Sequence, residues 1–238
     1  MFPIRDNVPS RTFPIVTVGL IVVNVLVFVV EFVGLDRAGM INFTTRFGLV
    51  PAALTAYFSG EPIGAGRAVL PLITSVFLHG GFIHLLGNMW YLWIFGDNVE
   101  DRLGHTRFLL FFLLCGIIGN LAHYAFNSGS PIPAIGASGA VAGVLGVYLI
   151  SYPGARILVL LPFFFLYFTE LPALVVLGFW IVLQFFNGAA SVVYSQATGG
   201  VAWWAHIGGF FGGMLIFRIF RPRPKVYLRA RRNPFYER

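Results

Sequence analysis

The sequence predicts an all-α membrane protein, a bundle of six transmembrane helices, and three observations lead to this prediction. Hydrophobic residues make up 58% of the 238 residues and charged residues only 11%, whereas a soluble domain is nearer one half and one quarter. Six apolar segments follow one another along the chain, and its C-terminal end is strongly basic. This composition excludes a soluble enzyme, a disordered protein and a nucleic-acid-binding domain, although the isoelectric point is about 10.0.

Each predicted helix is an apolar stretch that approaches the roughly 20 residues needed to cross a bilayer. The six stretches are residues 14–34, 82–95, 108–126, 135–152, 171–187 and 202–220, and apolar residues at 70–78 can extend the short second one. Residues 35–70 mix aromatic, apolar and charged types, which indicates a loop at the membrane interface. A seventh apolar run, residues 157–169, is short and contains Pro162, so we expect an interfacial or re-entrant segment there.

The basic residues predict the orientation of the bundle. Eight of them lie from residue 218 onward, two precede residue 14, and three stand at positions 102, 107 and 156. Six spans place all of these on one side and leave only Arg37, Arg46 and Arg67 on the other. Because basic loops stay inside, we expect a multi-pass protein of the cell membrane with both termini cytoplasmic. Its parts are an N-terminal cytoplasmic segment (1–13), the six-helix membrane domain (14–220) and a basic cytoplasmic tail (221–238).

Polar residues inside the predicted spans are candidates for function because they are costly in a membrane, and four of them stand out. His84 and Asn88 belong to the second span, Ser138 to the fourth and His206 to the sixth. These spans all run from outside to inside, and each polar group lies near the beginning of its span. His84 and Asn88 are four residues apart and share a helix face. We therefore expect all four side chains to converge just below the external surface.

Glycines predict how two of these spans pack. Gly139 and Gly143 follow the serine at a spacing of four, and Gly209 and Gly213 follow the histidine in the same way. Small residues at this spacing let membrane helices approach closely. The fourth and sixth spans can then bring Ser138 within hydrogen-bond reach of the sixth-span histidine.

The predicted chemistry is attack on a peptide carbonyl. A serine hydroxyl needs a base to take its proton, and His206 can serve Ser138 as that base. The Ser138 N–H, at a helix start, together with His84 and Asn88 would form an oxyanion hole. No carboxylate lies near these positions in the sequence, so we predict a Ser–His dyad. The single cysteine, Cys115, excludes a disulfide and a cysteine-based zinc site within the chain.

The motifs that carry these residues are His84-x-x-x-Asn88, Gly136-x-Ser138-Gly139 and Ala205-His206-x-x-Gly209-x-x-x-Gly213, with VEDRLG at residues 99–104. In this order they resemble the rhomboid family of intramembrane serine proteases, over residues 14–220. The resemblance implies a rhomboid-like bundle that cleaves transmembrane protein substrates near their outer ends, with no cofactor. It also implies Ser138 as nucleophile, His206 as base, and the oxyanion hole named above. Some members carry an aromatic residue four after the serine, where this chain has Ala142, so we expect Trp203 or Trp204 to hold the His206 ring.

Three alternatives stand beside this prediction. A catalytically inactive rhomboid-like protein that binds membrane clients would lack the nucleophile or the base, and this chain has both. A zinc protease would use His79, His84 and His206, but no HExxH motif is present. A transporter would show repeated halves. Membrane lipids are the expected contacts of the basic tail, residues 195–200 are a candidate lid over the site, and Gln184 is expected to bond between helices.

Overall fold

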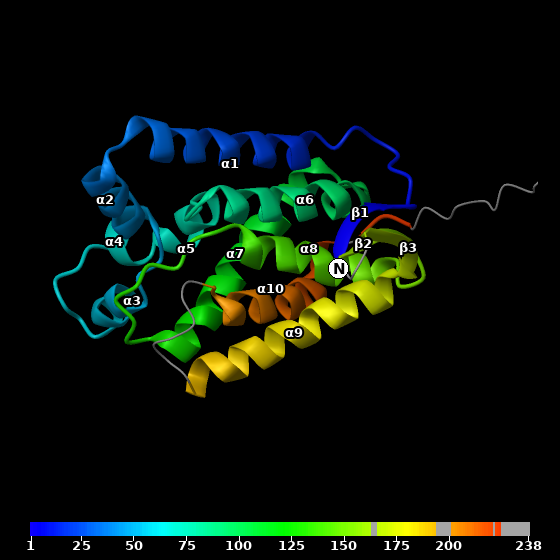
Figure 1. The fold of residues 1–238 in the computed structure, drawn as a ribbon. Coiled ribbons are helices and arrows are strands. Elements are labelled where there is room, and N and C mark those ends of the chain that lie inside the picture. The colour runs from blue at the N-terminus through cyan, green and yellow to red at the C-terminus, as the bar shows by residue number, and fades with distance from the viewer. Residues whose placement is uncertain (163–165, 194–200, 221, 225–238) are drawn as a thin grey trace, which may run out of the picture.

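The computed structural model describes residues 1–162, 166–193, 201–220 and 222–224, and this part of the chain is mostly helical. Figure 1 shows the long helices gathered in one bundle, with α1 along one side and α9 along the opposite side. Helix α10 packs chiefly against α7 and α8. The long elements are α1 (Ile15–Gly34), α6 (Phe82–Leu103), α7 (His105–Asn127), α8 (Ser138–Ser151), α9 (Ala173–Val193) and α10 (Trp203–Ile216), which η2 (Phe217–Phe220) extends.

Each of the six predicted apolar segments forms one of these helices. Not all of the six, however, are long and apolar enough to be counted as membrane spans. Helices α1, α7 and α9 are long and apolar enough to cross a membrane. A fourth span is counted if residues 65–77 and 82–103, which meet at a bend of 74°, form one broken span. Helices α8 and α10 have 14 residues each, which is about 21 Å of helix. The described residues therefore contain three or four candidate spans by length and composition.

Short helices occupy one end of the bundle, which we call the loop end (Figure 1). They are α2 (Arg37–Phe47), α3 (Pro51–Phe58), α4 (Ala65–Ala68), α5 (Pro71–Thr74) and η1 (Ser75–Phe77). The Asp36 side chain caps α2 by accepting a hydrogen bond from the Gly39 N–H at 2.7 Å. Leu49, Leu54 and Ala68 form a second small core beneath these helices. The segment predicted as an interfacial loop is thus largely helical and packed.

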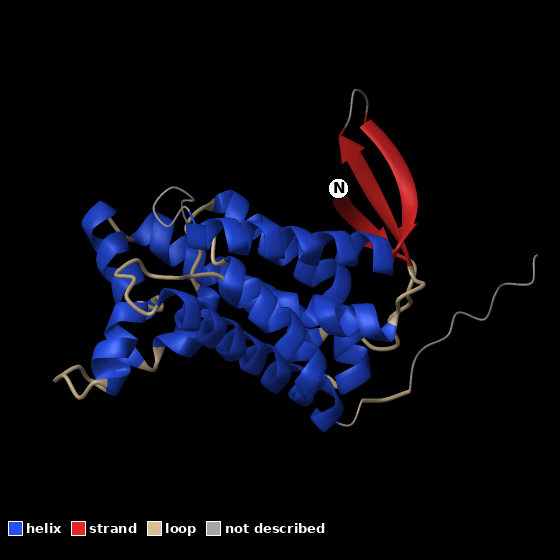
Figure 2. Ribbon diagram, turned by 90° about the horizontal axis from the view of Figure 1, so that it is seen from below, coloured by secondary structure: helices blue, strands red, loops and turns tan. Residues whose placement is uncertain are grey.

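A small antiparallel sheet lies at the other end, the sheet end, and projects from the bundle as Figure 2 shows. Its strands β1 (Phe2–Asp6), β2 (Arg156–Pro162) and β3 (Leu166–Pro172) are ordered β1-β2-β3. The all-α prediction missed this sheet, and most of the run 157–169, predicted as an interfacial or re-entrant segment, forms two of its strands. Ile157 and Val159 are fully buried and alternate with half-buried leucines, which is the period of two of a half-buried strand.

Carboxylates at the sheet end fasten the beginning of α1 to the end of α6. Glu100 accepts hydrogen bonds from the Val16 and Thr17 N–H groups at 3.0 and 2.8 Å and from the Thr17 hydroxyl at 2.7 Å. Asp101 accepts from the Thr12 hydroxyl at 2.7 Å. A helix start has unpaired N–H groups, so Glu100 supplies the acceptors that α1 lacks in its own sequence. The VEDRLG segment therefore has a structural role here.

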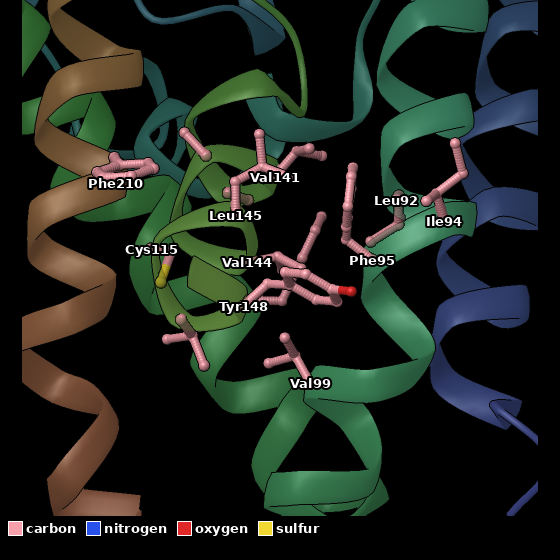
Figure 3. Close-up of a cluster of buried hydrophobic side chains, with 14 of the residues drawn as sticks. Leu92, Ile94, Phe95, Val99, Cys115, Val141, Val144, Leu145, Tyr148 and Phe210 are labelled. Carbon is pink, nitrogen blue, oxygen red and sulfur yellow. The ribbon is translucent and has the colours of Figure 1, made fainter. Parts of the chain in front are cut away.

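The core between α6 and α8 fixes the distance between the two helices. Figure 3 shows Phe95 of α6 against Tyr148 of α8, and their ring centroids are 4.8 Å apart. Both rings are fully buried. The Tyr148 hydroxyl donates a hydrogen bond to the Asp6 carboxylate, which joins the core to strand β1. The candidate lid, 195–200, and all but residues 222–224 of the predicted tail lie outside the described residues.

Candidate active site

Ser138 is the first residue of α8, and the turn before it brings the chain against α6. Gly136 in that turn has φ +123°, a conformation that favours glycine. A Cβ at Gly136 would lie 2.7 Å from His84 Nε2, so the close approach also requires glycine. The residue at the helix N-cap, Ala137, makes no side-chain capping bond. The backbone N–H groups at the start of α8, which include that of Ser138, therefore receive no acceptor from the N-cap side chain.

His84 and Asn88 face this turn from α6, one helical turn apart. Both lie close to Gly136, since its Cβ position is also 3.7 Å from Asn88 Nδ2. Asn88 is buried, with 7% of its surface exposed, and its Nδ2 has no hydrogen-bond partner among the described residues. An unpaired buried donor is costly. The Asn88 amide is therefore a free donor next to the serine.

Glycines bring α10 against α8, as the sequence predicted. A Cβ on Gly209 would lie 1.9 Å from the Gly139 carbonyl oxygen, and one on Gly213 would lie 2.7 Å from the Gly143 Cα. Real side chains do not tolerate such distances, so the two backbones are in direct contact at these positions. This contact sets the beginning of α10, with His206, beside the beginning of α8.

All four predicted site residues line one cavity of about 830 Å³ at the loop end. Ser138, His206, His84 and Asn88 come from the starts of α8, α10 and α6. The structure thus brings the four side chains to the same cavity. It does not join Ser138 to His206 by a hydrogen bond. Catalytic hydrogen bonds are often long before a substrate is bound, so this geometry is compatible with a nucleophile and its base.

Helix α9 holds the His206 ring. The His206 Nδ1 atom lies 2.8 Å from Gln184 Oε1. The ring stacks on Trp180, with centroids 5.8 Å apart and planes at 29°, and meets the edge of Trp203 at 6.0 Å. Trp203 thus contacts the ring as expected, whereas Trp204 stacks on Phe126 instead.

The prediction that Gln184 bonds between helices is therefore too general, because its partner is the site histidine. The contact of Trp180 with the His206 ring was not predicted. The two are four residues apart on α9 and share one face of it. That spacing was the available signal, but no sequence pattern links it to His206. Trp180 supplies the aromatic contact that Ala142 cannot.

The three histidines of the zinc-protease alternative do not form a metal site in the described part of the chain. His79 is buried and its ring centroid is 5.1 Å from that of His84, but it does not line the cavity. Within the described ranges, no three histidine, cysteine, aspartate or glutamate side chains are grouped so as to hold a metal ion. The zinc-protease alternative therefore lacks its ligand set in this part of the chain.

A family model described as "Rhomboid domain" matches residues 66–223, a range that contains all four cavity residues. The chain belongs to the rhomboid family. Among similar rhomboids, RHOMBOID-like protein 1 of Arabidopsis thaliana is 32% identical over 164 residues, 68% of this chain and 38% of that protein. Rhomboid protease GluP of Bacillus subtilis is 46% identical over 78 residues, 33% of this chain and 15% of its own length.

A third relative covers more of the chain. The human mitochondrial presenilin-associated rhomboid-like protein is 29% identical over 223 residues, 90% of this rhomboid and 53% of that protein. This rhomboid therefore spans about half or less of the length of these curated relatives. They include a mitochondrial protein and a bacterial protease. The family and the apolar helices identify a membrane protein.

Proposed function

We propose that this rhomboid is an intramembrane serine protease that hydrolyses peptide bonds in or near transmembrane segments of membrane proteins. The observation that supports this most directly is the convergence of Ser138, His206 and the unpaired Asn88 amide on one cavity. Hydroxyl, imidazole and free hydrogen-bond donors are the groups that acyl transfer needs. No cofactor is required for this chemistry.

In the first step, His206 Nε2 takes the proton of the Ser138 hydroxyl while Oγ attacks the substrate carbonyl carbon. The carbonyl π bond breaks and its electron pair moves to the oxygen, which becomes an oxyanion. The Ser138 N–H, the Asn88 amide and the His84 ring are the donors we assign to this oxyanion. Each such donor lowers the barrier by about 3 kcal/mol.

In the second step, the C–N bond breaks and His206 gives its proton to the leaving amine. The acyl group is then bound to Ser138 Oγ as an ester. Water attacks the ester carbon while His206 takes one of its protons, and the same donors hold the second oxyanion. This oxyanion collapses, the C–Oγ bond breaks, His206 returns the proton to Ser138 Oγ, and the acid product leaves.

The membrane placement is part of the proposal. Six helices between residues 14 and 220 would span the membrane of the cell, with the sheet end and both termini cytoplasmic. The beginnings of α6, α8 and α10 then lie at shallow depth on the external side, where water can reach the cavity. Substrates would be transmembrane proteins, membrane lipids would surround the helices and contact the basic tail, and nucleic acid would not be a partner.

Labelling with a fluorophosphonate, which reacts with activated serines, tests the proposal. We expect the parent chain and Ser151→Ala to be labelled, because Ser151 lies at the far end of the same helix. Ser138→Ala and His206→Ala should lose the label and the cleavage of a reconstituted transmembrane substrate. Equal labelling of Ser138→Ala and the parent would refute the assigned nucleophile.

The alternative is a catalytically inactive rhomboid-like protein that binds membrane clients. It would give no label and no cleavage in the parent chain, while a transmembrane client would co-purify equally with parent and Ser138→Ala. This pattern of results would replace the protease proposal with a binding function.

A further inference from the structure

We propose that Gln184 is a positioning residue, which selects the tautomer of His206 that leaves Nε2 free to accept a proton. The inference rests on the proposed function for the use of that proton, but the tautomer itself follows from hydrogen bonds alone. It gives α9 a specific part in the site, although α9 contributes neither the nucleophile nor the base.

The orientation of the Gln184 amide is fixed by its second hydrogen bond. Its Nε2 lies 3.0 Å from the backbone carbonyl oxygen of Trp180. A carbonyl oxygen only accepts, so the amide NH₂ must face Trp180. The amide oxygen, Oε1, is then the atom that faces His206 at 2.8 Å. This assignment follows from the bonding partners, which is the proper ground for orienting an amide.

The orientation of the amide in turn fixes the proton on the ring. Oε1 carries no hydrogen, so a hydrogen bond to His206 Nδ1 requires that Nδ1 be the donor. A neutral imidazole has one N–H group. Nε2 therefore holds the unshared electron pair that a general base uses. The tautomer is set by a chain of two bonds, from the Trp180 carbonyl through Gln184 to the ring.

Packing makes this chain of bonds rigid. Gln184 is 5% exposed, so water does not offer an easy replacement for either bond. The two tryptophan rings described above restrict rotation of the imidazole, with Trp180 on its face and Trp203 at its edge. Trp180 acts twice, because its carbonyl orients the amide and its ring stacks on the histidine.

The role resembles that of the acid in a Ser–His–Asp triad, performed by a neutral group. An acidic third member holds the imidazole in the correct tautomer and orientation. Gln184 does the same with an amide oxygen. Two further histidines of the described residues, His84 on α6 and His123 on α7, are near enough for their charge to influence His206 electrostatically. Among the residues that the structure describes, those that contact its ring or Nδ1 include no carboxylate.

The test combines a direct readout of the tautomer with kinetics. The ¹⁵N chemical shifts of labelled histidine distinguish protonated from unprotonated ring nitrogens, and the His206 signals are identified by their loss in His206→Ala. We expect the parent to show Nδ1 protonated and Nε2 unprotonated. Gln184→Leu should give a mixture of tautomers and lower kcat by about 10- to 100-fold, the range found when hydrogen-bond partners that orient metal-bound histidines are removed, with KM nearly unchanged.

Two further variants separate positioning from packing. Gln184→Glu retains an acceptor for Nδ1 and should restore most of kcat, with the acidic limb of the pH profile moved to higher pH because a carboxylate stabilises imidazolium. Asn187→Leu is the matched control, since this amide also bonds to a carbonyl four residues earlier, at 2.8 Å, but is exposed. It should leave the tautomer and kcat unchanged.

The outcomes are distinguishable. A parent with Nε2 protonated, or Gln184→Leu with the parent tautomer and parent kcat, overturns the inference. Equal losses in Gln184→Leu and Gln184→Glu overturn it as well, because they indicate a packing role. If the tautomer and its loss are as expected but Ser138→Ala still cleaves, the proposed function fails and the assignment of the hydrogen bonds stands.

Discussion

Replacing Gly209 by alanine tests whether close contact between α8 and α10 holds the proposed nucleophile, Ser138, beside its proposed base, His206. The added Cβ would lie 1.9 Å from the Gly139 carbonyl oxygen. Since carbon-to-oxygen contacts in close-packed helices are about 3.3 Å, the two helices must separate by about 1.4 Å at this point. Gly139 directly follows Ser138, so the displacement acts at the site itself.

The expected consequence is a large loss of activity with a smaller loss of stability. A misplacement of about 1 Å between reacting groups can cost about 100-fold in rate, so we expect kcat of Gly209→Ala to fall at least that far. Overpacking a tight contact costs about 1–3 kcal/mol, which leaves the protein folded. The assay is cleavage of a fluorogenic transmembrane substrate in proteoliposomes, with thermal unfolding measured on the same preparations.

Two further glycines make the prediction graded. A Cβ on Gly213 would lie 2.7 Å from the Gly143 Cα, so normal carbon contact requires only about 0.8 Å of separation. Gly213→Ala should therefore lose less activity than Gly209→Ala. Gly19→Ala is the control, because no atom lies within 4 Å of its Cβ position and alanine favours a helix. Parent activity and parent unfolding temperature in Gly209→Ala would refute the reasoning.

Three other changes address the oxyanion hole and the sheet end. Asn88→Ala should lower kcat by about 100-fold without abolishing cleavage, because other donors remain; full activity would remove Asn88 from the hole. Thr17→Val should lower the free energy of unfolding by about 2 kcal/mol, since it deletes a hydroxyl donor to the buried Glu100 carboxylate; no change in denaturant titrations would contradict that bond. Burial raises the pKa of Asp6 from 3.8 to about 6, although its bond with Tyr148 acts in the opposite direction. The folded state therefore holds this proton more tightly, and stability present below pH 4 should fall by roughly 3 kcal/mol as pH rises through 6. Unfolding of Asp6→Asn should lack this decline; an unchanged pH dependence would assign it to another group.

The sequence predicted the helices well where hydropathy alone decides them. The predicted start of α6 is correct, but the helix continues to Leu103, eight residues beyond the predicted end. Those residues include Glu100 and Asp101, which a hydropathy profile predicts to be exposed to water. They are buried because residues 12–17 supply donors to them. Such long-range pairing of polar groups is not visible in a local window of sequence.

The sheet and the support of His206 were beyond prediction for the same reason. Strand β1 pairs with β2 across about 150 residues, with Phe2 opposite Leu160. A run of apolar residues near a membrane fits an interfacial segment equally well until its partner strand is known. The four cavity residues, in contrast, were found because parity and helix period place them together. Gln184 carries no such signal, since an isolated amide in an apolar helix is expected to bond to a neighbouring helix but the sequence does not say to which residue.

A neutral amide suits the site of this rhomboid for an energetic reason. A carboxylate beside His206 would have to be buried in the membrane domain, and removing a carboxylate from water costs several kcal/mol unless it is fully paired. Gln184 orients the ring with one hydrogen bond, while a second bond to the Trp180 carbonyl holds its own amide, and it avoids that cost. Under the proposed mechanism, the imidazolium that forms when His206 takes the serine proton is stabilised by the Gln184 amide dipole and by the face of Trp180, and no described carboxylate contacts it. More of the barrier lowering must therefore come from the oxyanion donors at Ser138, His84 and Asn88, which makes the activity sensitive to loss of any one of them.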